Sequence, residues 1–331
     1  MTEPSASTAA PRILITRPLP GDAVARFHAA GHASVWQYPA DRCMPRSELL
    51  TRCAGIHGLL ATPMDVKIDA ELFDAAGPQL VVVSNYAVGV DNIDLEEAAR
   101  RGVAVGHTPG AVTEPTADVA WLLLLGAARR ATEGTQLVRS GSWTGIAPDQ
   151  LLGERVVGKT LLIVGAGRIG YATARRSLGW NMKVLYHARS RHPEFEAPPL
   201  HATRVELDEG LAQADVVSIH TPLTAQTRHL FDADRLARLR PTAILVNTAR
   251  GAVIDEAALV DALRTRRFAA AGLDVYENEP ALHPGLTELD NVFMLPHLGS
   301  ATREDRIWMM EIAVDNVVAA LAGEAMPHRI A

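Results

Sequence analysis

Short apolar runs alternate with amphipathic stretches along the 331-residue chain, and this pattern constrains the fold more than any other feature of the sequence. Near the N-terminus, the apolar runs RILIT and QLVVVSN are followed by stretches with helical periodicity, GDAVARFHAA and LEEAARRG. A long helical stretch from about 115 to 139 interrupts the pattern, which then resumes with TLLIVG, KVLYH, DVVSIH and AILVNT. Strands that alternate with helices indicate βαβ units. The sequence therefore predicts an α/β fold with parallel sheets.

Two long helical stretches, 115–139 and 302–321, enclose the second block of strands. The simplest topology is a continuous inner domain, 112–298, inserted into an outer domain that is built from 1–111 and 299–331. Two helices that cross between domains would form a hinged cleft, and ligand sites occur preferentially at such places. We therefore expect the active site in a cleft between the two domains.

Composition and charge limit the classes of partner. Hydrophobic residues make up 48% and charged residues 21%, a balance typical of globular proteins. The net charge of −6 argues against nucleic acid and membrane surfaces as partners, and no apolar run approaches the roughly 20 residues of a membrane span. Cys43 and Cys53 match no metal-binding pattern, so no metal is expected. The N-terminal residues lack the basic and apolar regions of a signal peptide, which predicts a cytoplasmic location.

The segment TLLIVGAGRIG places the pattern G-x-G-x-x-G between an apolar strand and the start of a helix. Alone, this pattern is also typical of a glycine-rich turn, but the strand and the helix supply the context of a dinucleotide-binding loop. Gly165 allows the tight turn, Gly167 lets the backbone approach a pyrophosphate, and Gly170 lets helix and strand pack closely. The helix N-terminus, with Arg168 and Ile169, offers N–H groups to the phosphates.

The next strand ends in HARSR, about 20 residues past the glycine loop, where such folds place the residue that reads the adenosine ribose. A carboxylate at this position would bind the ribose hydroxyls of NAD and repel a 2′-phosphate. Ala188 removes that repulsion, while Arg189 and Arg191 can bind phosphate oxygens through charge-assisted hydrogen bonds, with Ser190 as a further donor. A solvated basic turn is the plainer alternative. We expect NADP(H) as the preferred cofactor and NAD(H) as a second one.

Polar residues also follow the later strands. Arg250 comes just after ILVNT, Asp274 and Glu279 come after AAAGL, and His297 comes after VFML. Open α/β sheets bind ligands beyond the carboxyl ends of their strands, so these side chains are candidates for chemistry.

Long segments of the chain resemble the D-isomer-specific 2-hydroxyacid dehydrogenases, in their glyoxylate/hydroxypyruvate reductase branch. The resemblance covers nearly the whole chain and is carried, in the family's order, by SNYAVGVDNID (84–94), TPGAVTEPTADVAWLLL (108–124), GKTLLIVGAGRIG (158–170), HTPLTAQTRHL (220–230), NTARGAVIDEAAL (247–259), GLDVYENEP (272–280) and LPHLGSAT (295–302). It implies two Rossmann-like, doubly wound parallel-sheet domains, the outer one substrate-binding and catalytic and the inner one NADP-binding. It also implies a homodimer formed through the 115–139 region.

The family's catalytic arginine, glutamate and histidine match Arg250, Glu279 and His297. A planar guanidinium can hold the carboxylate of a 2-keto acid and polarise its carbonyl. A histidine can give a proton to the carbonyl oxygen as hydride reaches the carbon, and a neighbouring glutamate orients the ring and favours the imidazolium. The implied activity is the NADP(H)-dependent reduction of small 2-keto acids, such as glyoxylate or hydroxypyruvate, to D-2-hydroxy acids.

The same resemblance implies further contacts. The backbone amides of Val88 and Gly89 are expected to receive the substrate carboxylate, together with the side chains of Arg250 and His297. Asp274 is expected near the nicotinamide amide. The other residues expected to line the cofactor are Thr116, His220, Thr221, Pro222, Thr227, Thr248, Ala249, Arg250, His297 and Gly299.

One departure from the family leaves the substrate open, and three alternative classes of protein must be weighed. In some hydroxypyruvate reductases a tryptophan reaches a neighbouring subunit's pocket from a position a few residues after the counterpart of Trp143, where this chain has Ile146. Formate dehydrogenases of the superfamily carry glutamine at the position of Glu279. NAD-dependent phosphoglycerate dehydrogenases typically carry the acidic ribose residue that this chain lacks. A redox-sensing co-repressor of the same fold would keep all three catalytic residue types, so the sequence leaves that alternative open.

Overall fold

The computed structural model describes residues 10–63 and 66–331. The chain divides into two compact units, unit 1 (residues 1–112 and 301–331) and unit 2 (residues 113–300). These transitions lie close to those expected from the sequence, while the assignment of substrate to one unit and cofactor to the other stays a prediction. Within the described ranges, no helix has the length and apolar character needed to cross a membrane.

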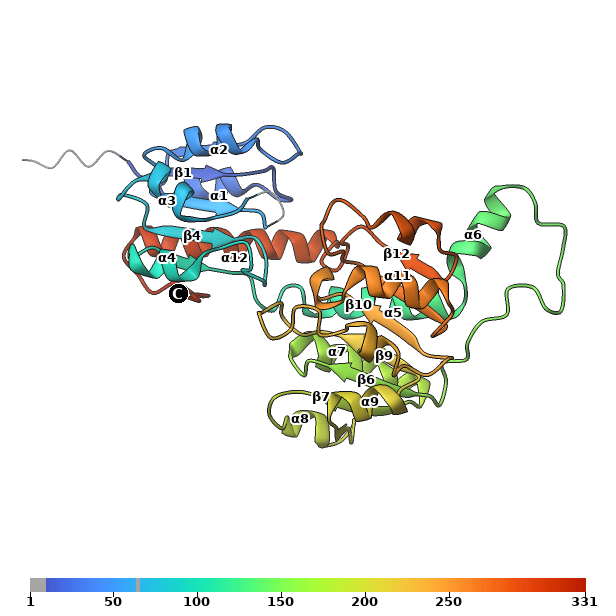
Figure 1. Cartoon of the computed structure of the whole chain (residues 1–331). Coiled ribbons are helices and arrows are strands. Elements are labelled where there is room, and N and C mark those ends of the chain that lie inside the picture. Colours follow the sequence, from blue (N-terminus) through green and yellow to red (C-terminus); the bar gives the residue numbers. More distant parts are fainter. Residues whose placement is uncertain (1–9, 64–65) are drawn as a thin grey trace, which may run out of the picture. The chain divides into compact units, whose positions relative to one another are not determined.

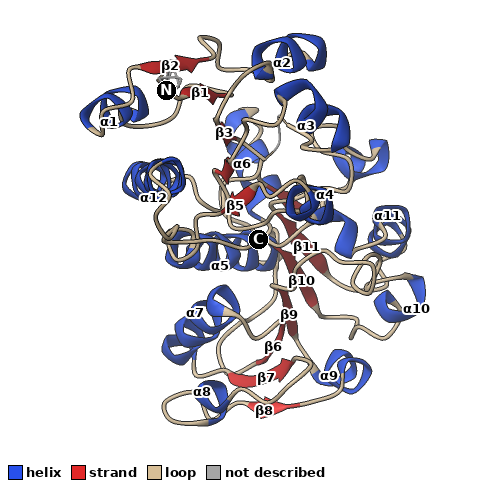
Figure 2. Cartoon of the chain, turned by 90° about the vertical axis from the view of Figure 1, so that its left-hand side faces the viewer, coloured by secondary structure: helices blue, strands red, loops and turns tan. Residues whose placement is uncertain are grey.

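Unit 1 is an α/β unit with one parallel sheet (Figure 2). Its strands are β1 (Arg12–Ile15), β2 (Ser34–Gln37), β3 (Gly58–Ala61), β4 (Val82–Asn85) and β5 (Ala104–Gly106), and its helices are α1 (Ala23–Ala29), α2 (Arg46–Cys53), α3 (Ala70–Ala76), α4 (Leu95–Arg100) and α12 (Arg303–Leu321). The five strands lie in the order β2-β1-β3-β4-β5, and all neighbouring pairs are parallel.

The C-terminal helix α12 belongs to unit 1, where it packs against β3, β4 and β5 (Figure 1). It begins as expected, because the Thr302 hydroxyl accepts a hydrogen bond from the Asp305 N–H at 3.1 Å and so caps the first turn. The buried side chain of Asn316 donates to the His107 carbonyl and accepts from the His328 N–H, each at 3.0 Å. These bonds fix the end of the chain to the segment after β5.

Unit 2 contains a second parallel sheet. Its strands are β6 (Thr160–Val164), β7 (Lys183–His187), β8 (Thr203–Arg204), β9 (Val216–Ile219), β10 (Ile244–Asn247), β11 (Ala270–Leu273) and β12 (Val292–Met294). Its helices are α5 (Thr113–Ala128), α6 (Ala131–Arg139), α7 (Arg168–Arg176), α8 (Pro193–Glu196), α9 (Leu207–Gln213), α10 (Ala233–Leu236) and α11 (Glu256–Arg264), with 3-10 turns η1 (Ser177–Trp180), η2 (Gly251–Val253) and η3 (Pro284–Glu288).

Both faces of this sheet are covered, which explains why β6 is apolar throughout. Leu162 and Val164 pack into one apolar cluster with residues of α9, α10 and α11, while Leu161 and Ile163 pack into another with residues of α5 and α7. Alternate residues of a strand point to opposite faces, so a strand covered on both sides needs an unbroken apolar run. The predicted fold class, with two parallel-sheet α/β units, is confirmed.

The strand order of unit 2 is β12-β11-β10-β9-β6-β7-β8, so the chain proceeds outward from β6 in both directions (Figure 2). β7 lies on one side of β6 and β9 on the other. Such a reversal opens a crevice beyond the carboxyl ends of the two strands, which is where open α/β sheets bind nucleotides. The glycine loop follows β6, and His220 follows β9, so both lie at this crevice.

The expected single helix over 115–139 is wrong, because two helices occupy this stretch. α5 ends at Ala128 and α6 begins at Ala131, and Arg130 between them adopts a left-handed conformation with φ +53°. The Ala128 carbonyl accepts from the Glu154 N–H at 2.8 Å instead of from the next helical turn. The break therefore depends on a segment more than 20 residues further along the chain, which local periodicity does not reveal.

Candidate active site

The structure brings Glu279 and His297 together in unit 2. The Nδ1 of His297 lies 2.8 Å from Glu279 Oε2, and the other carboxylate oxygen accepts from the Tyr276 N–H at 2.8 Å. The glutamate side chain is 13% exposed and the histidine side chain 39%, so the carboxylate is sheltered while the ring is accessible. Nε2 has no hydrogen-bond partner in the part of unit 2 that the structure describes. An Nδ1–H that donates to the carboxylate leaves Nε2 as the atom able to exchange a proton with a ligand.

Asp274 holds the backbone on both sides of this histidine. Its carboxylate accepts from the N–H groups of Leu298 and Gly299 at 2.7 and 2.8 Å, and its carbonyl accepts from the His297 N–H at 2.9 Å. Burial raises the pKa of Asp274, while the Leu298 amide, the charge of His297 and the Gly299 amide oppose that shift. His297 itself is left-handed, with φ +57°, an uncommon conformation that this set of bonds stabilises. The expected contact of Asp274 with a nicotinamide stays a prediction.

Arg250 is carried on a turn that the sequence analysis did not explain. The Asn247 side chain, at the end of β10, accepts from the Ala249 N–H and donates to the Arg250 carbonyl, each at 2.9 Å. Asn247 is 1% exposed, so the turn is held from within the protein. The signal was present in the sequence as an asparagine that ends an otherwise apolar strand. The Arg250 guanidinium donates to the Ala249 carbonyl at 2.8 Å.

Gly251 allows this turn to approach the loop that carries Glu279. A Cβ atom added to Gly251 would lie 1.8 Å from the Tyr276 carbonyl carbon and 2.3 Å from the Glu277 nitrogen. Only glycine lets two backbones come this close. The turn that carries Arg250 and the loop that carries Glu279 are therefore in close backbone contact, although the catalytic roles of the two residues stay predictions.

The glycine loop has the geometry of a phosphate cradle. Gly165 has φ +103°, and a Cβ atom there would lie 2.7 Å from the His220 carbonyl carbon, so this position requires glycine. A Cβ atom on Gly170 would lie 2.3 Å from the Gly165 carbonyl oxygen, which confirms the close packing of helix and strand. Gly167 precedes α7 without a side-chain cap, and a Cβ atom there would meet nothing within 4 Å. The first amides of α7, at Arg168 and Ile169, therefore face no protein cap, as a bound pyrophosphate requires.

Two buried polar atoms near the crevice have no hydrogen-bond partner among the described residues. They are His220 Nδ1, beyond β9, and Thr248 Oγ1, beyond β10. Burial lowers the pKa of His220 to about 3, and the ring's Nε2 lies 2.8 Å from the Ser218 hydroxyl. Unsatisfied buried polar groups are costly, so a partner from a ligand is the natural explanation. The residues present thus fit a dinucleotide.

The remaining residues expected to line the cofactor lie in α5 and in the loops that follow strands of the sheet. The Thr116 hydroxyl donates to the Gly299 carbonyl at 3.0 Å and connects α5 to the segment of His297. The Thr227 hydroxyl donates to the Pro222 carbonyl at 2.6 Å and closes the loop that begins at Thr221. These contacts are structural, and the expected contacts with a cofactor are not tested by them.

The tip after β7 shows that its two arginines differ. Arg189 and Ser190 are exposed and make no hydrogen bond or ion pair with any described residue. Arg191 instead forms a forked ion pair with Glu196, with distances of 3.1 and 2.6 Å. Sequence reasoning missed Glu196, because its proximity depends on the short helix α8 that turns the chain back toward the tip.

Unit 1 contributes the expected pair of amides after β4. The Asn85 side chain donates to the Gly89 carbonyl at 2.8 Å, and His107 Nδ1 lies 3.0 Å from the Val88 carbonyl. The N–H groups of Val88 and Gly89 have no acceptor within the described chain. A carboxylate can therefore bind them, and Asn85 and His107, which were not predicted, hold the backbone that presents them.

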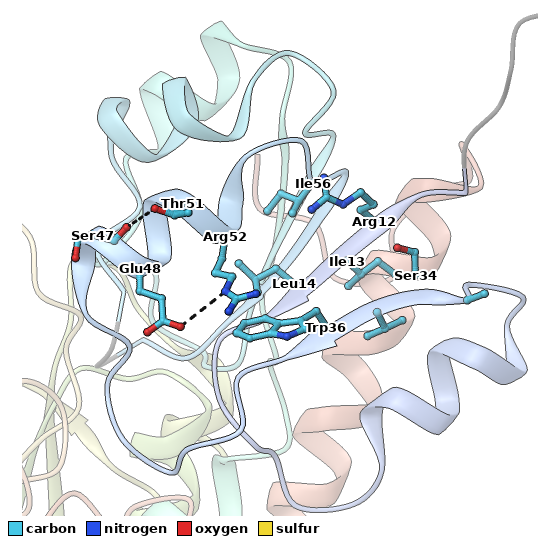
Figure 3. Close-up of a pocket in the computed structure, with 12 residues that line it drawn as sticks. Arg12, Ile13, Leu14, Ser34, Trp36, Ser47, Glu48, Thr51, Arg52 and Ile56 are labelled. Atoms are coloured by element: carbon cyan, nitrogen blue, oxygen red, sulfur yellow. Dashed lines mark hydrogen bonds and ion pairs between the residues drawn. The ribbon is translucent and has the colours of Figure 1, made fainter.

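A hollow of about 790 Å³ in unit 1 lies beside the edge strand β2 and α2 (Figure 3). Its wall includes Arg52, whose guanidinium lies 4.1 Å from the ring centroid of Trp36 and 3.7 Å from Glu48. None of its lining residues is among those expected to bind substrate or cofactor. This hollow is thus no part of the candidate site.

Comparisons with known proteins agree with this geometry. Residues 121–299 match the model of the D-isomer specific 2-hydroxyacid dehydrogenase, NAD binding domain. The chain is 46% identical over 321 residues to a glyoxylate reductase of Thermococcus onnurineus, with 96% of this chain and 95% of that protein covered. It is 44% identical over 321 residues to a glyoxylate reductase of Pyrococcus furiosus, with coverage of 96% and 94%.

Solved structures give the same result. An NADPH-dependent glyoxylate/hydroxypyruvate reductase of Sinorhizobium meliloti, in complex with NADP and malonate, is 32% identical with a TM-score of 0.84, over 98% of this chain and 97% of that one. A glyoxylate reductase of Paecilomyes thermophila is 34% identical with a TM-score of 0.87, over 97% and 98%. Relatives this similar over nearly their whole length establish the family. The chain belongs to the D-isomer-specific 2-hydroxyacid dehydrogenases, in the branch of the glyoxylate reductases.

Proposed function

We propose that the protein is an NADPH-dependent reductase that converts glyoxylate, hydroxypyruvate and similar small 2-keto acids into D-2-hydroxy acids. The observation that carries the proposal is the Glu279–His297 pair, which leaves Nε2 of a half-exposed ring available to a ligand beyond the carboxyl end of β12. The names and contents of the relatives' structures support the same class of substrate and cofactor.

The three catalytic residues have distinct roles in this proposal. Arg250 binds the carboxylate and the keto oxygen of the substrate and polarises the carbonyl. His297 gives its Nε2 proton to that oxygen as hydride reaches the carbon, and Glu279 keeps the ring oriented. The amides of Val88 and Gly89 bind the substrate carboxylate in this proposal.

The cofactor would be held by the glycine loop, the first amides of α7 and the unsatisfied groups of His220 and Thr248. When bound, the reduced nicotinamide supplies the hydride. Arg189, which has no partner of its own among the described residues, is available for a 2′-phosphate. NADPH is therefore the preferred cofactor and NADH the weaker one.

A panel of 2-keto acids with NADPH and with NADH tests this function through the absorbance of the reduced nicotinamide. We expect turnover of glyoxylate and hydroxypyruvate, with kcat/KM at least about tenfold higher for NADPH, the effect of about 1.4 kcal/mol. Cofactor binding without turnover of any keto acid would contradict the proposal. That result would favour the alternative of a redox-sensing binding protein of co-repressor type.

We further propose that two copies of the chain form a homodimer through α6 and the segment after it. α6 has no buried residue, and the segment carries apolar side chains in solvent, with Val138 62%, Trp143 51%, Ile146 92% and Leu152 68% exposed. Figure 1 shows α6 and the following loop as an arm that extends from the sheet of unit 2. Exposed apolar groups concentrated in one segment are typical of a protein interface. A second copy is the partner that a homodimer-forming family implies.

Light scattering during size-exclusion chromatography measures the mass in solution. We expect twice the 35.5 kDa of one chain. Val138→Asp places a charge in the proposed interface and should shift the protein toward the monomer. A monomeric wild-type protein would contradict the proposal. We also propose that the protein is located in the cytoplasm.

A further inference from the structure

A buried tyrosine lies beneath the tip that we propose for the 2′-phosphate. The Tyr186 side chain extends from β7 and is 0% exposed. Its hydroxyl donates to Glu196 Oε1 at 2.6 Å and accepts from the His192 N–H at 3.0 Å. The tyrosine therefore fixes both Glu196 and the backbone of the tip from within the protein.

Glu196 in turn holds Arg191. The guanidinium donates from Nε to Oε1 at 3.1 Å and from Nη2 to Oε2 at 2.6 Å, the parallel arrangement of a forked pair. Hydrogen bonds from Arg191 and from Tyr186 lower the pKa of Glu196, so the carboxylate is charged at neutral pH. The Glu196 side chain is 24% exposed, whereas that of Arg191 is 76% exposed. One end of the pair is thus anchored and the other reaches into solvent.

The fork leaves Arg191 with donors to spare. A guanidinium has five N–H donors, and the pair with Glu196 engages one edge of the group, so the Nη1 end stays available to an anion. An exposed arginine normally loses much side-chain freedom when it binds a ligand. An arginine that the protein already holds loses less, and binding is strengthened accordingly.

We propose that Glu196, which Tyr186 anchors, is a positioning residue for Arg191. The chain of contacts from Tyr186 through Glu196 to Arg191, here called the relay, raises the affinity of the protein for a cofactor with a 2′-phosphate. The inference deepens the proposed function and rests on it. Arg189 and Arg191 then contribute differently. Arg189 is an exposed cation without a partner in the described chain, whereas Arg191 is held by Glu196.

Calorimetric titration of the purified full-length protein with NADPH and with NADH tests the relay without relying on turnover. We expect Glu196→Ala to raise the Kd for NADPH by about 3- to 10-fold, the scale of one exposed charge-assisted contact, and to leave the Kd for NADH within about twofold. Glu196→Gln keeps an oxygen acceptor for Arg191 and should give a smaller loss. Tyr186→Phe keeps the ring in place and should weaken NADPH binding in the same direction.

The loss should depend on Arg191. In an Arg191→Ala background, Glu196→Ala should add no further loss, because a positioning residue has nothing left to position. Glu194→Ala is the matched control, since Glu194 lies on the same helix α8 but pairs with His192 Nδ1 at 3.0 Å instead of with an arginine. It should leave both dissociation constants unchanged.

Four outcomes would overturn the relay. If Glu196→Ala tightens NADPH binding, the carboxylate only opposes the phosphate. If Glu196→Ala weakens NADH binding as much as NADPH binding, Glu196 stabilises the fold and does not position Arg191. An additional loss in the Arg191→Ala background, or an unchanged NADPH affinity, would also contradict it. Failure of the proposed cofactor preference gives a different result, because the wild-type protein would then bind NADPH no more tightly than NADH.

Discussion

At the scale of the residue, the proposed chemistry depends most on the exposed nitrogen of one histidine. The pair with Glu279 occupies Nδ1 of His297, so the proton for the substrate oxygen must come from Nε2. His297→Ala should lower kcat by about 10²- to 10⁴-fold, the usual contribution of a general acid. The Kd for NADPH, measured by titration, should change little, because in our proposal the glycine loop and α7 hold the phosphates. A variant that keeps wild-type kcat would remove His297 from the chemistry.

Glu279→Gln tests the partner of this histidine through the kcat of reduction. The wild-type carboxylate accepts the hydrogen bond from Nδ1 of His297 and so leaves Nε2 for the substrate. A glutamine can also present an N–H donor to Nδ1, which favours the wrong ring tautomer, so kcat should fall. Glu277→Gln is the control, since Glu277 is on the same loop but pairs with His229 at 2.7 Å. An unchanged kcat in Glu279→Gln would contradict the pairing.

At the scale of the element, the site depends on two loops whose backbones touch. Gly251→Ala should push the loop of Glu279 away from the turn of Arg250, because the added carbon would lie 1.8 Å from the Tyr276 carbonyl carbon. We expect a loss of about 1–3 kcal/mol in the free energy of unfolding, the range for overpacked sites, together with a fall in kcat. Thermal unfolding followed by circular dichroism measures the first effect.

Gly179→Ala is the matched control for that variant, because a Cβ atom at Gly179 would meet nothing within 4 Å. Its melting temperature and kcat should equal those of the wild-type protein. If Gly251→Ala behaves like Gly179→Ala, the close approach of the two loops does not constrain the site.

The elements also show what sequence periodicity can and cannot predict. The glycine loop and the polar residues after β10, β11 and β12 were predictable, because each follows an apolar run that the parallel sheet requires. The break at Arg130 was not, since it depends on the hydrogen bond from Glu154 to Ala128. Asn247 and Glu196 were missed for the same reason, because their partners are set by how turns and short helices fold back.

At the scale of the molecule, the resemblance to a family predicted more than the residue pattern alone. The alternation of apolar and helical segments predicted two α/β blocks and a glycine loop, and the structure confirms two parallel sheets. Helix α6 was expected only as part of a longer helix over 115–139. Ile146 is 92% exposed in a single copy, so none of the described residues covers this apolar side chain.

In our proposal, the range of substrate sizes that the enzyme accepts depends on the dimer. The carboxylate and keto oxygen of the substrate are fixed by Arg250, His297 and the amides of Val88 and Gly89 in our proposal, so specificity depends on what faces carbon 3 and beyond. If the arm reaches the partner's site, Ile146 leaves a wider pocket mouth than an indole would, with one N–H donor fewer. Keto acids longer than glyoxylate and hydroxypyruvate should then be accepted.

Ile146→Trp should narrow this range, because the larger side chain excludes bulky substrates more than it excludes glyoxylate. Steric discrimination in a pocket is usually about 1–3 kcal/mol, so the ratio of kcat/KM for a bulky keto acid to that for glyoxylate should fall by about 5- to 150-fold. Leu152→Trp is a control on the same arm, at a side chain that is 68% exposed. An unchanged ratio in a dimeric Ile146→Trp protein would show that the arm lies away from the pocket, and the pocket would then be closed by residues of a single chain.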